Sequence, residues 1–191
     1  LEQRQNVVSL KAPMTRLEEG EIKRINLTTP QRLAVETIVA KLDVHQTWLL
    51  QGVTGSGKTE VYFEIMANTL DLNRQVLVLV PEINLTPQFE SRLRKRFPEH
   101  EIVTLNSSMT DKERYQAWSL ARSGSASIVL GTRLAVFASL PQLGLIVVDE
   151  EHDLSYKQVE GVRYNARDLA IYVASQQKVP IVLGSATPSL E

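Results

Sequence analysis

The sequence predicts an α/β fold: a three-layer sandwich with helices on both faces of a mostly parallel central sheet. Short apolar runs alternate with amphipathic segments, and the runs lie at 47–50, 75–80, 101–105, 127–132, 145–150 and 180–186. They are nearly continuous in Val, Ile and Leu, which is typical of strands buried on both faces. The segments between them read as helices, at roughly 58–72, 84–97, 110–122 and 166–177. Right-handed crossovers then place any ligand at the carboxyl ends of the strands.

The composition fits one folded domain. The chain has 191 residues, 43% of them hydrophobic, and a net charge of −1. This content excludes a disordered chain, and no apolar stretch is long enough for a transmembrane helix, so we expect no membrane partner. The first residues are too polar for a secretory signal. With no Cys, the chain holds no disulfide and no thiolate metal site. Because the charge is nearly balanced, any contact with nucleic acid must come from a local patch.

The least regular part of the chain is 1–27, which we interpret as a linker or the remnant of a preceding domain. A helix is expected to begin at 28, because Thr28 and Thr29 offer hydroxyl caps and Pro30 suits a first helical position. We therefore assign 28–191 to one nucleotide-binding domain.

A phosphate-binding loop is the strongest signal. Residues 52–59 match G-x-x-x-x-G-K-[ST] at every fixed position, with an apolar run before and a helical segment after. Glycines let successive N–H groups converge on phosphate oxygens, Lys58 reaches the β/γ-phosphates, and the Thr59 hydroxyl suits Mg²⁺. The predicted nucleotide-binding residues of the loop are Gly52, Val53, Thr54, Gly55, Ser56, Gly57, Lys58 and Thr59.

An apolar run that ends in acids supplies the second half of the site. Asp149 follows the run 145–148 and is expected to support Mg²⁺ opposite the loop, while Glu150 orients and deprotonates the attacking water. Three successive acids in a solvated turn are the simpler alternative. Guanine nucleotide is disfavoured, because no N-K-x-D follows a later strand.

Two further segments favour an ATPase that acts on a polymer. Gln31 can read the adenine edge with one donor and one acceptor, although an exposed helix glutamine would look the same. The run 184–189, GSATPS, offers small hydroxyl side chains that could sense the γ-phosphate.

Together these segments resemble the first RecA-like lobe, with a P-loop NTPase fold, of superfamily 2 helicases of the D-E-x-H type. Longer matches narrow the resemblance to the replication-restart DNA helicases; they lie at 52–62, 79–88, 147–161, 163–170 and 184–191. The resemblance implies an ATP- and Mg²⁺-dependent motor that moves 3′-to-5′ on single-stranded and forked DNA and starts primosome reassembly. It also implies primosome proteins and single-strand-binding protein as partners, and a cytoplasmic, nucleoid-associated location in bacteria.

The resemblance also assigns roles to single residues. His152 would couple the nucleotide to the segment around Ser185, Ala186 and Thr187. Single-stranded DNA would contact Thr86, Gln88, Thr132 and Arg133, and the loop 154–164 resembles an aromatic-rich loop that links DNA to hydrolysis. In that loop Tyr156 and Tyr164 would stack on bases, with Lys157 and Arg163 on phosphates. Caps and turns are the alternative use of such hydroxyls and arginines.

Several positions depart from the family pattern. Val162 stands where Trp is usual, Asn165 where His is usual, and Leu134 where Ser is usual; Asn106 and Ser108 replace a His and a Gly. Losing an aromatic platform removes about 1–3 kcal/mol of stacking per base. The coupling of DNA to hydrolysis is therefore the inheritance these substitutions affect most.

The family also has a second RecA-like lobe, which supplies arginines, and a zinc module built from cysteines. We expect both outside this chain, so that the chain alone binds ATP weakly, hydrolyses it slowly and unwinds nothing. Two alternatives stay open: an ATP-dependent assembly switch without unwinding, and an RNA helicase lobe. The basic run at 91–97 is expected to be the solvated face and end of a helix, and His45 and His100 receive no role.

Overall fold

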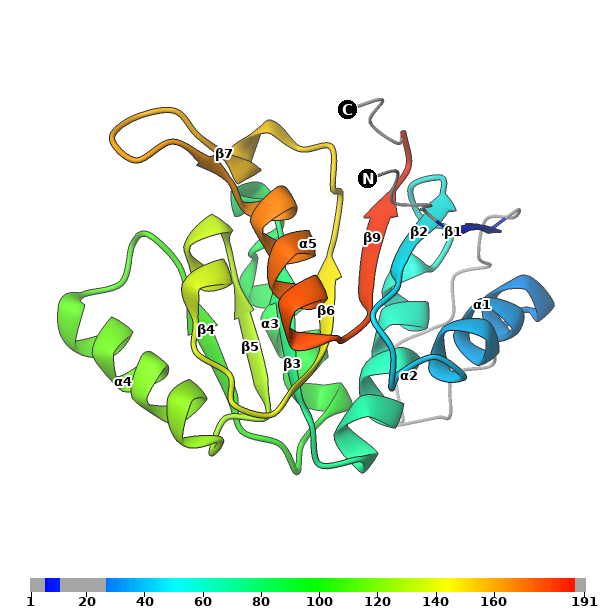
Figure 1. The fold of residues 1–191 in the computed structure, drawn as a ribbon, viewed down its shortest axis with the longest axis horizontal. Helices are drawn as coiled ribbons and strands as arrows, with labels where there is room; N and C mark the ends of the chain where they lie inside the picture. The colour runs from blue at the N-terminus through cyan, green and yellow to red at the C-terminus, as the bar shows by residue number, and fades with distance from the viewer. Residues whose placement is uncertain (1–5, 11–26, 188–191) are drawn as a thin grey trace.

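The computed structural model describes residues 6–10 and 27–187. Its centre is a seven-stranded parallel sheet with the order β1-β2-β9-β6-β3-β5-β4 (Figure 1). The strands are β1 (Asn6–Leu10), β2 (Thr47–Gly52), β3 (Gln75–Leu79), β4 (Ile102–Leu105), β5 (Ile128–Gly131), β6 (Leu143–Val148) and β9 (Ile181–Ser185). Two short antiparallel strands, β7 (Lys157–Gln158) and β8 (Tyr164–Asn165), form a separate hairpin.

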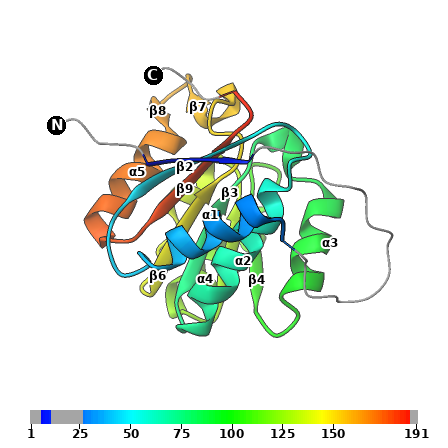
Figure 2. The same ribbon diagram turned by 90° about the vertical axis from the view of Figure 1, so that its right-hand side faces the viewer.

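Helices cover both faces of the sheet. They are α1 (Thr29–Val39), α2 (Lys58–Asp71), α3 (Pro87–Arg96), α4 (Asp111–Ser123) and α5 (Ala166–Gln177). One core joins α1, α2 and α3 to the sheet, and a second core joins α4 and α5 to the opposite face (Figure 2). Three short 3₁₀ helices, η1 (Glu82–Asn84), η2 (Arg133–Phe137) and η3 (Leu154–Tyr156), follow β3, β5 and β6. The predicted three-layer α/β sandwich is confirmed.

The first helix begins as predicted. Thr28 is its N-cap, and Thr28 and Gln31 form a capping box with Pro30 in the first turn. Such a box satisfies backbone N–H groups that the first turn of a helix leaves without partners.

One strand was not predicted. We interpreted 1–27 as a linker or domain remnant, whereas Asn6–Leu10 adds a parallel strand to the edge of the sheet beside β2. Val8 pairs with Leu50 and Leu10 with Gly52, and only Leu10 is fully buried. A five-residue edge strand with alternating burial carries too few apolar residues to stand out in sequence. Residues 1–5 and 11–26 lie outside the described residues.

The topology brings the functional segments to one edge. The phosphate loop follows β2, the acids follow β6, and 185–187 lie at the end of β9; these three strands are neighbours or next neighbours in the sheet. Within residues 6–10 and 27–187, the helices are too short or too polar to cross a bilayer.

Candidate nucleotide site

The phosphate loop has the backbone its glycines allow. Gly55 and Gly57 adopt φ of +79° and +81°, and Gly57 is the N-cap of α2. A side chain rarely tolerates this left-handed region, so glycine is needed where the loop turns into the helix. The amide of Ser56 donates to the Val53 carbonyl at 3.0 Å, which closes the turn. The loop therefore ends at a helix N-terminus, where backbone N–H groups attract phosphate.

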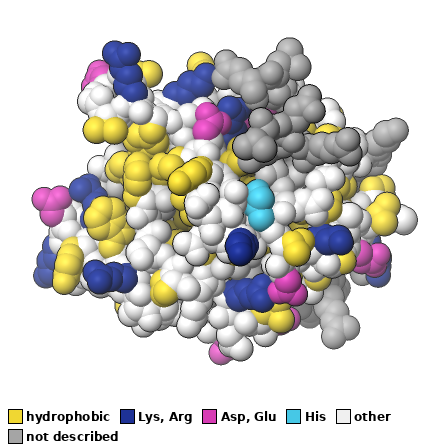
Figure 3. Space-filling model, in the orientation of Figure 1, with side chains coloured by type: hydrophobic (Ala, Val, Ile, Leu, Met, Phe, Trp, Pro, Cys, Tyr) yellow, Lys and Arg dark blue, Asp and Glu magenta, His cyan; other side chains and the backbone are white. Residues whose placement is uncertain are grey.

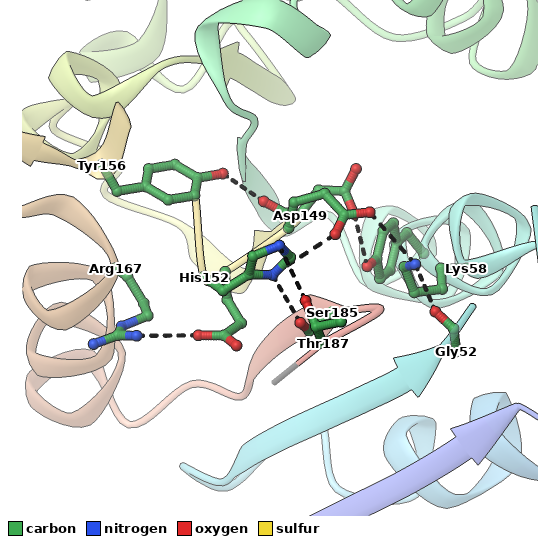
Figure 4. Close-up of polar contacts among 11 residues, drawn as sticks. Gly52, Lys58, Asp149, His152, Tyr156, Arg167, Ser185 and Thr187 are labelled. Carbon is green, nitrogen blue, oxygen red and sulfur yellow. Dashed lines mark hydrogen bonds and ion pairs between the residues drawn. The ribbon is translucent and has the colours of Figure 1, made fainter. Parts of the chain in front are cut away.

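Lys58 links the loop to the acids. Its side chain is 7% exposed, and its Nζ donates to the Gly52 carbonyl at 2.9 Å. The same Nζ lies 3.5 Å from Oε1 of Glu150 (Figure 4). The predicted meeting of the glycine loop and the acidic strand end is therefore present.

Three hydrogen bonds hold Asp149, and the backbone turns sharply at Glu150. The Asp149 amide donates to the Leu79 carbonyl at 2.9 Å, which ties the end of β6 to β3. The Tyr62 hydroxyl donates to Oδ1 of Asp149 at 3.0 Å, and the Tyr156 hydroxyl donates to the Asp149 carbonyl at 2.6 Å. Glu150 adopts a positive φ of +44°, which turns the chain sharply after the strand. Such a conformation is uncommon for a residue with a side chain and clusters at functional sites.

His152 lies between the acids and the end of β9. Its Nδ1 is 2.9 Å from the Ser185 hydroxyl and 3.8 Å from Oε2 of Glu150. Its Nε2 is 3.4 Å from the Thr187 hydroxyl. The imidazole therefore lies between Glu150 and the segment 185–187 that it was predicted to contact, while its coupling role stays a prediction.

Burial shifts the ionisation of this cluster. Burial, and then the charge of Glu150, raise the pKa of Asp149 above its usual range, against the hydrogen bond from Tyr62. Burial, followed by the charge of Asp149, raises the pKa of Tyr62 and of Tyr156 well above that of a free phenol. Both phenols therefore stay protonated at neutral pH and act as donors.

The chain offers a fitting environment for Mg²⁺ bound with phosphates. Among the described residues, no group of three or more His, Asp or Glu side chains could by itself hold a metal ion. Magnesium in nucleotide enzymes uses one or two carboxylates together with substrate phosphates, so a complete protein cage is not required. Thr59 lies in the first turn of α2 next to Lys58, and the Ser56 hydroxyl is buried without a partner inside the loop. Thr59 and Asp149 therefore stay the predicted protein ligands of such a phosphate-bound ion.

Comparison with known proteins decides the family. The DEAD/DEAH box helicase family matches residues 28–191. The chain belongs to this family. It is 49% identical over 168 residues to replication restart protein PriA of Haemophilus influenzae, which covers 88% of this chain and 23% of that relative. It is 42% identical over 186 residues to PriA of Helicobacter pylori, which covers 97% of this chain and 30% of that relative. The chain thus spans less than a third of the length of either relative.

Solved structures agree with this family. A structure of RecG bound to a three-way DNA junction matches with a TM-score of 0.66 and 26% identity, over 87% of this chain and 22% of that one. The Pyrococcus furiosus Hef helicase domain matches with a TM-score of 0.55 and 25% identity, over 82% and 33% of the chains. The predicted RecA-like fold and the resemblance to replication-restart helicases are confirmed.

Gln31 is buried, so it is not the exposed helix glutamine that was the alternative interpretation. It is 2% exposed; its Oε1 accepts from the Thr28 amide at 2.8 Å, and its Nε2 donates to the Ser56 carbonyl at 3.0 Å. The side chain therefore braces the phosphate loop from α1. A second N–H and a second lone pair of the amide remain, so the contact with adenine stays a prediction.

The DNA-facing predictions divide. Gln88 is exposed, Thr86 caps α3 by accepting from the Phe89 amide at 3.2 Å, and Arg133 lies 3.3 Å from Glu82. Thr132 corrects our expectation, because it is 2% exposed and its hydroxyl is buried. In this conformation Thr132 packs inside the fold after β5 and cannot reach a phosphate.

Tyr156 is the second correction. We expected it to stack on bases, but it is 1% exposed and its hydroxyl is bonded to Asp149. A phenol that belongs to the core beneath the acids cannot leave it without breaking that bond. Tyr164 is half-buried, with its ring centroid 5.0 Å from that of Phe137, while Lys157 and Arg163 are exposed.

The exposed apolar side chains around the hairpin are mostly aliphatic. Val162 is 83% exposed, and Leu154, Val159 and Phe137 are also exposed. Figure 3 shows hydrophobic side chains gathered beneath this hairpin. The expected departure at Val162 therefore lies on the surface, where the aromatic side chain of the family pattern would face solvent.

Three of the other departures, Asn165, Asn106 and Ser108, have local roles. Asn165 caps α5 by accepting from the Arg167 amide at 3.0 Å, and Oδ1 of Asn106 accepts from the Ser108 amide at 2.9 Å. In the basic run, Arg92 lies 2.7 Å from Glu60 and Arg96 lies 2.8 Å from Glu64. The run is the paired outer face and end of α3, as predicted.

The sequence-based prediction did not include three residues that support the acids: Tyr62, Glu151 and Arg167. Tyr62 stands one helical turn after Lys58, and Glu151 forms a buried ion pair with Arg167 at 3.1 Å (Figure 4). The i, i+4 spacing of Lys58 and Tyr62 was a usable signal, since such residues share one face of a helix. No sequence pattern pairs Glu151 with Arg167, because the hairpin separates them.

Proposed function

We propose that the chain is the ATP-binding motor lobe of a DNA helicase that restarts stalled replication. The observation that carries the proposal is the Lys58 ammonium 3.5 Å from Glu150, beside Asp149 and above a glycine loop. Phosphoryl transfer to water needs positioning and charge stabilisation more than covalent chemistry, and this cluster supplies both. The similarity to PriA relatives supports the restart role.

In this mechanism the loop amides and Lys58 bind the triphosphate. Thr59 and Asp149 would hold Mg²⁺, which when bound would neutralise charge on the phosphates. Glu150 then accepts a proton from the attacking water at one of its carboxylate oxygens. His152, between Glu150 and Ser185, relays the state of the nucleotide to the end of β9.

We further propose a direction of movement, a substrate and partners for the complete motor protein. Movement is 3′-to-5′ along single-stranded DNA, forked DNA is the substrate, and primosome proteins and single-strand-binding protein are partners. The protein works in the bacterial cytoplasm with the nucleoid. RecG, the structural relative bound to a DNA junction, supports a DNA substrate.

The chain alone should bind ATP weakly, hydrolyse it slowly and unwind nothing. Arg167, whose guanidinium lies 3.1 Å from Glu151, is engaged by Glu151 and Asp168 and is not available to the γ-phosphate. An arginine supplied by a second lobe is worth about 10³–10⁵ in rate in related NTPases. Robust strand separation by this chain in an unwinding assay would refute this part.

Lys58→Ala tests the proposal directly. We expect the variant to lose Mg²⁺-dependent binding of a fluorescent ATP analogue, because the buried cation that meets the phosphates is gone. Lys41→Ala, at an exposed lysine beyond α1, is the matched control and should bind like the parent. Equal binding by Lys58→Ala and the parent would reject the nucleotide site.

An assembly switch without unwinding is the second candidate, since exposed aliphatic residues occupy the hairpin where an aromatic platform is expected. The discriminating assay compares the ATPase rate with no nucleic acid, with single-stranded DNA and with RNA, on the chain joined to its second lobe. Stimulation by DNA supports the motor, stimulation by RNA alone indicates an RNA helicase, and none indicates the switch.

A further inference from the structure

Helix α2 faces the acids with two side chains one turn apart. Lys58 and Tyr62 are at i and i+4, so both point to the same side of the helix. Lys58 meets Glu150 at 3.5 Å, and Tyr62 meets Oδ1 of Asp149 at 3.0 Å. One helix face therefore holds both carboxylates, each by a different chemical group.

The phenol of Tyr62 has little freedom to move. The side chain is 2% exposed and lies in the core cluster between α2 and the sheet. Gly184 of β9 passes so close that a Cβ there would overlap the Tyr62 hydroxyl and lie 3.3 Å from Oδ1 of Asp149. The absence of a side chain at 184 therefore makes the room in which the hydrogen bond forms.

We infer that Tyr62 is a positioning residue: its hydroxyl orients the Asp149 carboxylate for Mg²⁺, and Gly184 keeps the space for it. The inference rests on the proposed function and adds two residues to it. Groups that hydrogen-bond a metal-binding carboxylate fix its orientation, and losing one typically costs about 10- to 100-fold in metal affinity or activity. Tyr62 touches neither water nor phosphate in this role and acts only through Asp149.

The test measures binding rather than turnover. A fluorescent ATP analogue is titrated at increasing Mg²⁺ and, separately, in EDTA, with the parent and Tyr62→Phe, which keeps the ring and removes the hydroxyl. We expect the half-saturating Mg²⁺ concentration to rise by roughly 10-fold. Affinity in EDTA should stay within about twofold of the parent, because the loop and Lys58 are untouched. A general loosening of the fold would lower both affinities together and would overturn the inference.

A matched control removes the other phenol on Asp149. Tyr156→Phe deletes a buried hydroxyl that bonds the backbone carbonyl of Asp149 instead of its carboxylate. We expect its effect on half-saturating Mg²⁺ to be clearly smaller than that of Tyr62→Phe. An equal effect would overturn the inference, because backbone support alone would then explain both.

Two further variants keep the test decisive. If Tyr62→Phe does not fold, Gly184→Ala takes its place, since the added Cβ displaces the phenol without removing it; an unchanged Mg²⁺ requirement would overturn the inference. In the Asp149→Asn background, Tyr62→Phe should add no further rise, because the two residues act as one unit. A parent that binds no nucleotide would sink the proposed function itself, whereas binding with an unaltered Mg²⁺ requirement in Tyr62→Phe sinks only this inference.

Discussion

Around the phosphate loop, functional side chains are buried or partly buried and bonded to protein groups, whereas much of the β7–β8 hairpin faces solvent. Lys58, Asp149 and His152 each have a protein partner within 3.0 Å. On the hairpin Val159, Val162 and Arg163 are exposed. The residues of the nucleotide site are therefore held in place by the protein itself, whereas the exposed hairpin side chains are not. Groups held in place before the reaction do not have to reorganise during it.

The boundary between the two regions is narrow. Tyr156 precedes the hairpin and bonds Asp149, and Arg167 follows it and bonds Glu151. Both ends of the hairpin are thus attached to the acidic segment. Burial, and not the kind of amino acid, therefore distinguishes the residues of this loop that contact the acids from those on the surface.

The largest expected effect is on chemistry in the organised region. Glu150→Gln keeps the shape of the side chain and removes the base, so we expect ATP hydrolysis to fall by about 10²–10⁴-fold while ATP binding persists. Single-turnover hydrolysis and analogue binding measure the two separately. Glu99→Gln, at an exposed position before β4, is the control. Equal hydrolysis in Glu150→Gln and the parent would mean that the water is activated elsewhere.

At the boundary, we expect a large loss of stability. Arg167→Ala leaves Glu151, which is buried, without the guanidinium 3.1 Å away. Breaking a buried ion pair costs about 3–5 kcal/mol, because the remaining charge loses a partner that offset its desolvation. Urea unfolding measures the free energy of unfolding. Arg163→Ala, exposed on the hairpin, should change it by less than about 0.5 kcal/mol; similar losses in both variants would erase the distinction between the regions.

On the exposed region, an added aromatic side chain should improve binding. Val162→Trp restores a stacking surface, so affinity for single-stranded DNA should rise by about 1 kcal/mol, the lower end of base stacking on an aromatic. Fluorescence anisotropy with a labelled oligonucleotide measures it. Leu72→Trp, which also replaces an exposed aliphatic but at the far end of α2, is the control. Equal gains would indicate nonspecific adhesion to Trp.

The smallest expected effect is on the pH dependence of stability. Because burial and Glu150 raise the pKa of Asp149, the folded chain holds this proton more tightly than the unfolded chain. The protonated group therefore favours folding at low pH, and that contribution is lost as the pH rises through the raised pKa. In EDTA, Asp149→Asn should be more stable than the parent near pH 7, and the difference should shrink on acidification. A difference that does not change with pH would contradict this account.

Patterns local to the chain predicted most of the fold and the nucleotide half of the site. The apolar runs predicted strands, and the loop 52–59 and Asp149 predicted the ends that meet. Such patterns predict structure because a buried parallel strand requires consecutive apolar residues, and a phosphate loop requires glycines and a lysine at fixed spacing. The strand Asn6–Leu10 was not predicted, because so short a segment has no clear pattern of its own. It is a strand because it pairs with β2, which lies far along the chain.

The sequence by itself determined the parallel α/β sheet, the glycine loop and the acids that meet it, because backbone conformation and hydrophobic periodicity encode these locally. The tertiary structure alone decided that Tyr156 and Thr132 are buried, that Gln31 braces the loop, and that Tyr62 and Arg167 hold the acids. Burial and long-range hydrogen bonds depend on which segments pack together. The identity of a tyrosine therefore does not show whether it lies beneath a carboxylate or on the surface.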